Sequence, residues 1–224
     1  MDELENIKMR YAWRAENLAP PTKGDMCFAR AHIKERESKF LKILHRHFGN
    51  DFSMLKMIEI GAGGGQNLHF FIRSGFAMNN IWANELLDDR FDLLKQNFPE
   101  ITADHGDASR LDHHNIFDLV LQSTVFTSIL NDPLKQKLAD TMYAMVKPGG
   151  MILWYDFTFD NPRNKHVKGV GKSEIRQLFQ KASDIRFTRV TLAPPIGRKV
   201  FGMYNLINFA FPFLRTHIIA EIYK

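Results

Sequence analysis

The central stretch of the chain reads Ile58-Glu59-Ile60-Gly61-Ala62-Gly63-Gly64-Gly65-Gln66-Asn67-Leu68. An apolar run leads directly into glycines at alternate positions, and a segment with helical character follows. Glycines at Gly61, Gly63 and Gly65 let the backbone turn sharply and approach a ligand without interference from a Cβ atom. The helix that follows presents its free N–H groups at the same place. The stretch therefore predicts a nucleotide-type binding turn, to which Glu59 adds a carboxylate at the end of the strand.

Composition bounds the class of protein. With 45% hydrophobic and 25% charged residues in 224 positions, the chain has the composition of one soluble globular domain. The single cysteine, Cys27, excludes an internal disulfide framework and favours a reducing, cytoplasmic compartment. The acidic first residues predict no secretory signal, and no apolar run reaches the about 18 residues of a membrane-spanning helix. The formal charge of +5 suits an anionic substrate, a membrane surface or an ordinary solvated surface.

Two helices are expected ahead of the glycine stretch. The spacing of apolar residues predicts an amphipathic helix over residues 2–18, which Pro20-Pro21 ends. A second helix is expected over 26–48. So short a segment buries little core alone, and we therefore interpret residues 1–53 as a helical cap on a domain that spans 54–224.

From Met54 onward, short apolar runs alternate with helical segments, the pattern of βαβ units and a mostly parallel sheet. Strands are expected at 56–61, 80–84, 101–105, 117–122 and 151–155. Helices are expected over 65–74, 87–98 and 133–145, and a turn at 147–150 precedes the fifth strand. The tail predicts a helix over 173–181 and two strands, 184–192 and 216–223, which an apolar insertion at about 194–215 joins into an antiparallel edge.

Polar side chains follow the second, third and fourth strands, at the edge where open α/β sheets bind ligands. Glu85 lies about 20 residues after the last glycine, where a carboxylate accepts hydrogen bonds from two ribose hydroxyls. Asp107, in a Gly-Asp-Ala string, is placed to accept from the exocyclic amine of adenine, and Gln122 ends the fourth strand. The alternatives are that Glu85 caps the next helix and that Asp107 caps a turn.

Together these residues resemble class I S-adenosylmethionine-dependent methyltransferases. The resemblance rests on E-I-G-A-G-G-G at 59–65, G-D-A at 106–108, F-D-L-V-L-Q at 117–122 and V-K-P-G-G-M-I-L-W at 146–154. It covers roughly residues 54–192 and implies an α/β, Rossmann-like fold: a seven-stranded, mostly parallel sheet with an antiparallel final strand and helices on both faces. The implied cofactor is S-adenosyl-L-methionine, with S-adenosyl-L-homocysteine as product.

The resemblance also assigns residues to this cofactor: Glu59, Gly61, Ala62, Gly63, Gly65, Glu85, Leu86, Asp107, Ala108 and Gln122. Those of the glycine turn would pack against its methionine part, with Glu59 supporting the amino group and Gln122 nearby. Glu85 would bind the ribose, and the residues after the third strand would contact the adenine. A dinucleotide cofactor is the competing interpretation, but its fingerprint requires a third glycine where the chain has Gln66.

Methyl transfer from a sulfonium is an in-line displacement, and a hydroxyl acceptor must also lose its proton. Residues 154–164 bring polar and aromatic groups to the carboxyl edge of the sheet. We predict Asp156 as the general base, Tyr155 as a further catalytic residue and Arg163 as the group that binds an anionic acceptor. The alternative is that Asp156 caps a turn and that Arg163 is solvated. Other candidate bases are His105, His113 and His114, and no ligand spacing predicts a metal site.

The segment 198–215 is strongly apolar and aromatic, too short to span a bilayer, and flanked by cations. One interpretation is an interfacial helix with peripheral membrane contact, or the wall of a pocket for a hydrophobic acceptor. The other is burial over the core or against the second subunit of a homodimer.

The sequence says less about the acceptor than about the donor. No Asn-Pro-Pro-Tyr-like string follows the fourth strand and no basic module is appended, so we expect no nucleic acid partner. The strings L-W-Y-D-F…N-P-R-N, L-A-P-P-I-G-R and F-L-R-T-H resemble a bacterial subgroup linked to polysaccharide or O-antigen biosynthesis. That resemblance makes a sugar hydroxyl, on a nucleotide sugar or a lipid-linked glycan, the leading acceptor. The alternatives are a hydrophobic small molecule, such as a quinone, lipid or secondary metabolite, and a non-catalytic cofactor-binding protein.

Overall fold

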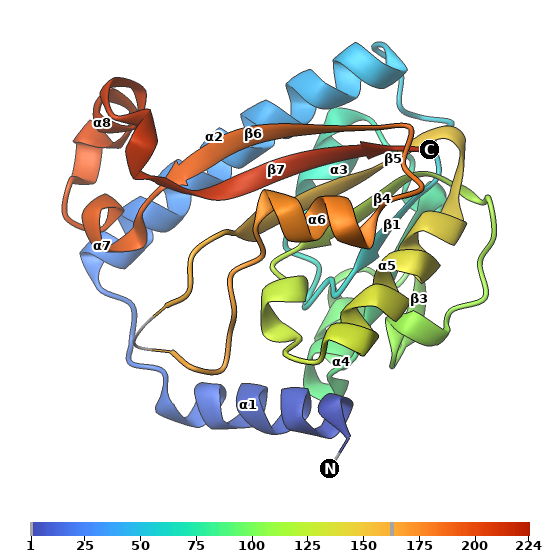
Figure 1. Ribbon diagram of the computed structural model, residues 1–224, viewed down its shortest axis with the longest axis horizontal. Helices are drawn as coiled ribbons and strands as arrows, with labels where there is room; N and C mark the ends of the chain where they lie inside the picture. The colour runs from blue at the N-terminus through green and yellow to red at the C-terminus, as the bar shows by residue number, and fades with distance from the viewer. Residues whose placement is uncertain (1, 162–163) are drawn as a thin grey trace.

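The computed structural model describes residues 2–161 and 164–224 and contains a seven-stranded sheet between helices (Figure 1). The strands are β1 (Met57–Ile60), β2 (Ile81–Glu85), β3 (Thr102–His105), β4 (Phe117–Ser123), β5 (Val146–Phe157), β6 (Asp184–Leu192) and β7 (Arg215–Tyr223). Their order is β3-β2-β1-β4-β5-β7-β6. The pairs among β1 to β5 are parallel, whereas β7 runs antiparallel to both of its neighbours. The predicted fold is confirmed.

The α-helices are α1 (Glu3–Asn17), α2 (Lys23–Phe48), α3 (Leu68–Ser74), α4 (Asp88–Asn97), α5 (Asp132–Met145), α6 (Lys172–Leu178), α7 (Pro194–Gly197) and α8 (Tyr204–Ala210). Short 3-10 helices join them: η1 (Met78–Asn80), η2 (Ala108–Arg110), η3 (Phe126–Ser128), η4 (Phe201–Met203) and η5 (Pro212–Leu214). Some predicted boundaries are wrong. α2 begins at Lys23 rather than residue 26, because Thr22 and Asp25 form a capping box. The predicted turn at 147–150 is a bulge inside β5, since the register with β4 shifts there.

The core consists of two apolar layers, one on each face of the sheet. Alternate residues of a strand point to opposite faces. Ile58 and Ile60 therefore pack in the layer that contains α5 and α6, whereas Met57 packs in the layer that contains α2 and α3. Figure 1 shows α5 and α6 in front of the sheet, with α2 and α3 behind it. The same alternation determines which side chains of the site can meet.

The two N-terminal helices occupy different parts of the sheet. α2 packs along one face through Phe40, Ile43 and Leu44. α1 crosses the carboxyl edge of the parallel strands, at the bottom of Figure 1, and is held to η3 through Arg10, whose Nη2 donates to Ser128 O at 2.9 Å. A helix in this position covers the edge at which ligands bind in open α/β sheets.

The segment between β6 and β7 forms α7, η4, α8 and η5 at the left end of the molecule in Figure 1. It packs on the first half of α2, where a Cβ on Gly197 would come within 2.4 Å of the Phe28 ring. Its outer side exposes large apolar side chains, which are Phe201, Met203, Leu206, Phe209, Phe211 and Phe213. Across the described ranges, no helix combines the length and apolar character needed to cross a membrane.

Candidate active site

The glycine turn between β1 and α3 has the conformation that the sequence predicts. Gly61, Gly63 and Gly65 have φ values of 66°, 59° and 85°, in the left-handed region that residues with a Cβ rarely adopt. A Cβ at Gly61 would also come within 2.6 Å of Val125 Cγ2, and one at Gly65 within 2.4 Å of the Phe98 ring. The first and third glycines are therefore required both by the backbone conformation and by the space around them.

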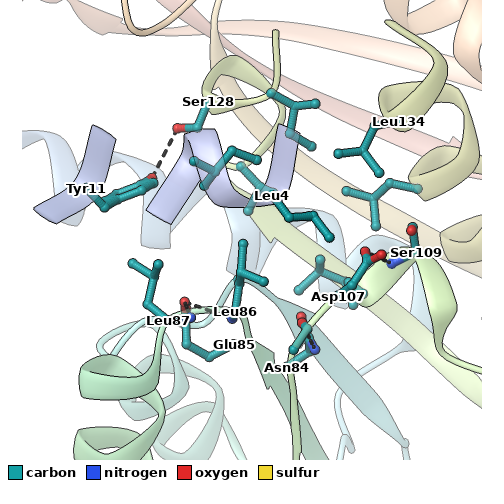
Figure 2. A pocket seen from close by; sticks show the side chains of 18 of the residues that line it. Leu4, Tyr11, Asn84, Glu85, Leu86, Leu87, Asp107, Ser109, Ser128 and Leu134 are labelled. Carbon is teal, nitrogen blue, oxygen red and sulfur yellow. Dashed lines mark hydrogen bonds between the residues drawn. The ribbon is translucent and has the colours of Figure 1, made fainter. Parts of the chain in front are cut away.

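A cavity opens beside this turn, at the carboxyl edge of β1, β2 and β4 (Figure 2). The empty space it encloses, with its open mouth included, is about 770 Å³. The predicted cofactor residues that line it are Gly61, Glu85, Leu86, Asp107 and Ala108. Ala62, Gly63 and Gly65 shape the turn rather than line the cavity. The structure thus brings half of the predicted set to one place, and their ligand roles stay predictions.

Two carboxylates in this cavity are oriented by the backbone around them. Glu85 accepts from Gly63 N at 2.7 Å and from the N–H groups of Leu86 and Leu87 at 2.9 Å each. A carboxylate has about four acceptor positions, so Glu85 keeps capacity toward the cavity. Asp107 accepts from Ser109 N at 2.9 Å and caps η2 while it lines the cavity (Figure 2). The capping alternative for Asp107 is therefore present, and it is compatible with the predicted contact to adenine.

A chain of charged and polar side chains lies at the end of the turn where the methionine part is predicted. Glu59 is 1% exposed, its Oε1 accepts from Asn67 Nδ2 at 2.6 Å, and its Oε2 has no partner among the described residues. Arg36 reaches this place from α2, donating to Asn67 Oδ1 at 2.5 Å and to Ser123 Oγ at 3.2 Å, while its buried Nε has no partner there. Burial raises the pKa of Glu59 to about 8, although Asn67 and Arg36 oppose the shift.

Buried polar atoms in folded proteins are nearly always hydrogen-bonded. The two unsatisfied atoms of Glu59 and Arg36 therefore mark a place for a ligand that carries both charges. An α-amino acid end fits this requirement, because its ammonium matches the carboxyl of Glu59 and its carboxylate matches the guanidinium of Arg36. The sequence pointed to Glu59 but gave no signal for Arg36, which lies on a helix well ahead of the glycine turn.

α1 supplies a wall of the cavity that the sequence did not predict. Leu4, Ile7 and Tyr11 line it, and Figure 2 shows Leu4 and Tyr11 on the side opposite Glu85. The Tyr11 hydroxyl lies 3.0 Å from Ser128 Oγ. The apolar spacing on α1 was the available signal, but it shows only that this side of the helix is buried, not which surface it covers.

Of the predicted catalytic residues, Tyr155 and Asp156 do not meet. Tyr155 and Asp156 are consecutive in β5, so their side chains point to opposite faces of the sheet. The Tyr155 hydroxyl lies 2.9 Å from Thr191 Oγ1, whereas Asp156 is fully buried and accepts from Thr127 Oγ1 at 2.7 Å. Burial raises the pKa of Tyr155 to about 12 and that of Asp156 to about 7. Neither residue lines the cavity, and Arg163 lies outside the described residues.

The contacts of Asp156 favour the alternative in which it caps a turn. Two of its hydrogen bonds join β5 to Thr127 of η3, and a third comes from the N–H of its neighbour Phe157. Gln122 is also buried, with its Oε1 accepting from Val125 N at 3.1 Å. The other candidate bases each pair with a nearby carboxylate, in the pairs His105–Asp88, His113–Asp104 and His114–Asp112. Within the described part of the chain, no group of His, Cys, Asp and Glu side chains is arranged to hold a metal ion.

Comparison with known proteins agrees with this geometry. A family model described as a methyltransferase domain matches residues 57–150. The fold is similar to that of magnesium protoporphyrin IX methyltransferase from Synechocystis PCC 6803 with bound S-adenosylmethionine (TM-score 0.67, 11% identity, 100% of this chain and 98% of that chain). It is also similar to geranyl diphosphate C-methyltransferase from Streptomyces coelicolor A3(2) in complex with Mg²⁺, geranyl diphosphate and S-adenosylhomocysteine (0.66, 12%, 100% and 99%).

A third structure, the N-methyltransferase NodS from Bradyrhizobium japonicum WM9, covers 86% of this chain and 96% of its own, with a TM-score of 0.63 and 14% identity. No curated protein is similar in sequence to the chain. At such low identities the structural likeness shows the fold, and the match at residues 57–150 shows the domain. The chain therefore has the class I methyltransferase fold that the resemblance implied, and its residues 57–150 match a methyltransferase domain.

Proposed function

We propose that the protein is an S-adenosylmethionine-dependent methyltransferase that methylates a sugar hydroxyl. When bound, the cofactor supplies a methyl group on a positively charged sulfur. The cofactor assignment is carried by one observation, the buried and unpartnered Glu59 Oε2 and Arg36 Nε beside the glycine turn. They match the ammonium and the carboxylate of the cofactor's amino acid end. Asn67 is hydrogen-bonded to both and fixes their spacing.

The remaining cavity residues account for the nucleoside. Glu85, held by three N–H groups, is oriented to accept from the ribose hydroxyls. Asp107 and Ala108 lie further along the same edge, where they would contact the adenine. α1 closes the cavity with apolar side chains, which exclude water and strengthen the electrostatic contacts inside.

A lipid-linked carrier for the sugar is supported by the segment between β6 and β7. Phe209 is 82% exposed and Phe213 is 68% exposed, and Lys199 lies in the same exposed segment. Aromatic side chains next to cations are typical of surfaces that enter the interfacial layer of a membrane. We infer peripheral membrane contact through residues 198–215, which would bring the cavity close to a lipid-linked acceptor.

A hydrophobic small-molecule acceptor is the second candidate. It is favoured by the same exposed aromatic residues, taken as part of an apolar acceptor surface. Two of the structurally similar proteins are described as acting on, or binding, magnesium protoporphyrin IX and geranyl diphosphate. The two candidates differ in the kind of molecule that receives the methyl group, a sugar or an apolar compound, so one acceptor panel separates them.

The test combines binding with transfer. Calorimetry with S-adenosylhomocysteine should show saturable binding to the wild-type protein and none to Gly63→Arg, which introduces a side chain at φ 59° in the turn. Gly171→Arg is the matched control, since a Cβ there meets nothing within 4 Å. Labelled methyl transfer is then measured on nucleotide sugars, polyprenyl-linked glycans and hydroxyquinones. Absence of binding would refute the proposal, labelling of only the quinones would favour the second candidate, and binding without any transfer would favour a non-catalytic protein.

A further inference from the structure

A second group of side chains lies on the α2 face of the sheet, next to the cavity. Ser123 of β4, Tyr155 of β5 and His217 of β7 point to this face, as do His32 and Arg36 of α2 from the opposite side. The guanidinium carbon of Arg36 lies 5.0 Å from the Tyr155 ring centroid, and the His217 ring stacks on Tyr155 at 5.2 Å and 16°. We call these five residues the α2-face cluster. Ser123 belongs to both the cluster and the cavity wall, so the two places adjoin.

The cluster contains a buried polar atom that the proposed cofactor does not satisfy. In the part of the chain that the structure describes, five buried side-chain nitrogen or oxygen atoms have no hydrogen-bond partner. Arg36 Nε and Glu59 Oε2 are matched by the amino acid end of the cofactor, which leaves His32 Nδ1 as the unsatisfied atom of the cluster. A buried polar atom in a folded protein normally has a hydrogen-bond partner, and a polar group of a ligand can be that partner.

Backbone strain points to the same place. Thr124 and Thr191 have φ values of 61° and 60°, which are outliers for β-branched residues. Thr124 directly follows Ser123, and its N–H donates to Tyr155 O at 2.9 Å. Thr191 holds the Tyr155 hydroxyl at 2.9 Å, and its own N–H donates to Glu35. Residues held in such conformations gather at functional sites, where the surrounding structure imposes them.

His217 is the residue of the cluster best placed to handle a proton. Its Nδ1 lies 3.1 Å from Thr216 Oγ1, so the tautomer in which Nδ1 donates to Thr216 leaves a free lone pair on Nε2. Burial, His32 and Arg36 lower the pKa of His217 to about 3, and burial and Arg36 lower that of His32 to about 4. Both imidazoles are therefore neutral at physiological pH. His32, Arg36 and His217 are each half-buried, and Ser123 connects the cluster to the cavity wall.

We propose that the α2-face cluster is the binding site for the methyl acceptor, that the acceptor carries a hydroxyl group, and that His217 Nε2 takes its proton. This inference rests on the proposed function and names the substrate class of the same site. As the acceptor oxygen bonds to the methyl carbon, the carbon–sulfur bond breaks and its electron pair stays on sulfur. The hydroxyl proton passes to the imidazole. The products are a methyl ether, a neutral thioether and an imidazolium ion.

A weak base suffices for this step. Methyl transfer to a hydroxyl generates a protonated ether, which is a far stronger acid than an imidazolium ion. The positive charge of Arg36 nearby favours early release of the proton to water, which restores the neutral imidazole. An amine acceptor that is already deprotonated needs no such base, which is why the cluster points to a hydroxyl.

The inference is tested with His217→Ala, His217→Gln and the control His114→Ala, whose exposed ring pairs with Asp112. The hydroxyl probes are a methyl hexopyranoside, a uridine diphosphate hexose and a polyprenyl-diphosphate-linked hexose, each with its 2-amino-2-deoxy counterpart. We expect both His217 variants to lose about 100-fold to 10,000-fold in turnover of a hydroxyl probe, with His114→Ala unchanged. Calorimetry with S-adenosylhomocysteine should give the same affinity for all four proteins, which also shows that the variants are folded.

A second readout does not depend on turnover. In ¹⁵N spectra recorded with S-adenosylhomocysteine bound, the His217 ring should stay neutral from pH 8 to pH 5 and shift when the methyl hexopyranoside is added. Full turnover by His217→Ala, transfer to the amino probes only, or an unshifted His217 ring would overturn the inference. So would a wild-type protein that binds S-adenosylhomocysteine but methylates no hydroxyl probe. Failure to bind S-adenosylhomocysteine would instead refute the proposed function.

Discussion

Replacing Glu59 by glutamine removes the charge that we assign to the cofactor's ammonium while it keeps the size of the side chain. Burial raises the pKa of Glu59 to about 8, so its carboxyl is mostly protonated in the free protein at pH 7. A bound ammonium favours the carboxylate, so the wild-type protein must release a proton as S-adenosylhomocysteine binds. We therefore expect the affinity to rise with pH up to about 8 and then to level off.

The magnitude follows from the shifted pKa. Each pH unit below it weakens binding by up to tenfold, or about 1.4 kcal/mol. Between about pH 8 and about pH 6 the dissociation constant of the wild-type protein should therefore rise by up to about 100-fold. Glu59→Gln cannot release a proton, so it should bind more weakly at pH 8 and show no such slope.

The raised pKa of Glu59 has the opposite consequence for the stability of the free protein, which should fall as the pH rises. Its pKa is about 8 when folded and near its ordinary 4.5 when unfolded, so the folded state binds more protons between these values. Below about pH 4.5 the Glu59 carboxyl is protonated in both states, and the free energy of unfolding is at its full value. As the pH rises toward 8 the free energy of unfolding falls, because the carboxyl ionises more readily in the unfolded state. At pH 7 this loss is on the order of 3 kcal/mol, which Glu59→Gln should recover, with no gain at pH 4.

Calorimetry in two buffers of different ionisation enthalpy measures both the affinity and the protons released, and urea unfolding measures the stability. Glu37→Gln is the matched control, because Glu37 lies on the outside of α2 and pairs with Arg73. It should change neither quantity. A wild-type affinity that is flat between pH 6 and pH 8, without proton release, would refute the assignment of Glu59 to the ammonium.

The other predictions concern separate parts of the site. Arg36→Met should weaken binding of S-adenosylhomocysteine by about 10-fold to 100-fold, since it removes charge-assisted hydrogen bonds to the carboxylate; calorimetry measures this. Leu4→Ser should speed dissociation of the same ligand in stopped-flow experiments, because Leu4 closes the cavity. Phe209→Ser with Phe213→Ser should abolish cosedimentation with anionic phospholipid vesicles, each exposed ring contributing about 1.5–3 kcal/mol when buried. Asp156→Ala should destabilise the fold by about 1–3 kcal/mol in urea without changing ligand affinity, because it leaves Thr127 unsatisfied.

Three control variants change exposed side chains away from the cavity. Arg73→Met is the control for Arg36→Met, Met9→Ser for Leu4→Ser, and Met54→Ser for the double phenylalanine variant. A control that weakens binding as much as its partner variant would show a general loss of folding. For Asp156, loss of turnover at unchanged stability would instead support the base role predicted from the sequence. Cosedimentation of the double phenylalanine variant at the wild-type level would contradict membrane contact through residues 198–215.

The sequence predicts the parts of this protein that local chemistry determines. Glycines at positions with φ near +60° and apolar runs of strand length are local properties, so the turn and the order of strands and helices follow from them. Arg36 is different, because only the packing of α2 on the sheet brings it to Asn67 and Ser123. The separation of Tyr155 from Asp156 was within reach, since neighbours on a strand point to opposite faces. His217 carries no local signal at all, as its role depends on which strand lies beside β5.

The location of these residues also fits the charge balance of a methyl transfer. Glu59 and Arg36 would hold the amino acid end of the cofactor, which when bound would supply a methyl group on a positively charged sulfur. In the proposed step a positive charge appears on His217, within the same half-buried layer between α2 and the sheet. The layer therefore keeps its total charge through the step, and its fixed dipoles need little rearrangement. Because His32 and Arg36 disfavour the imidazolium, the proton then leaves for water, and the site returns to the neutral state in which it can accept the next hydroxyl proton.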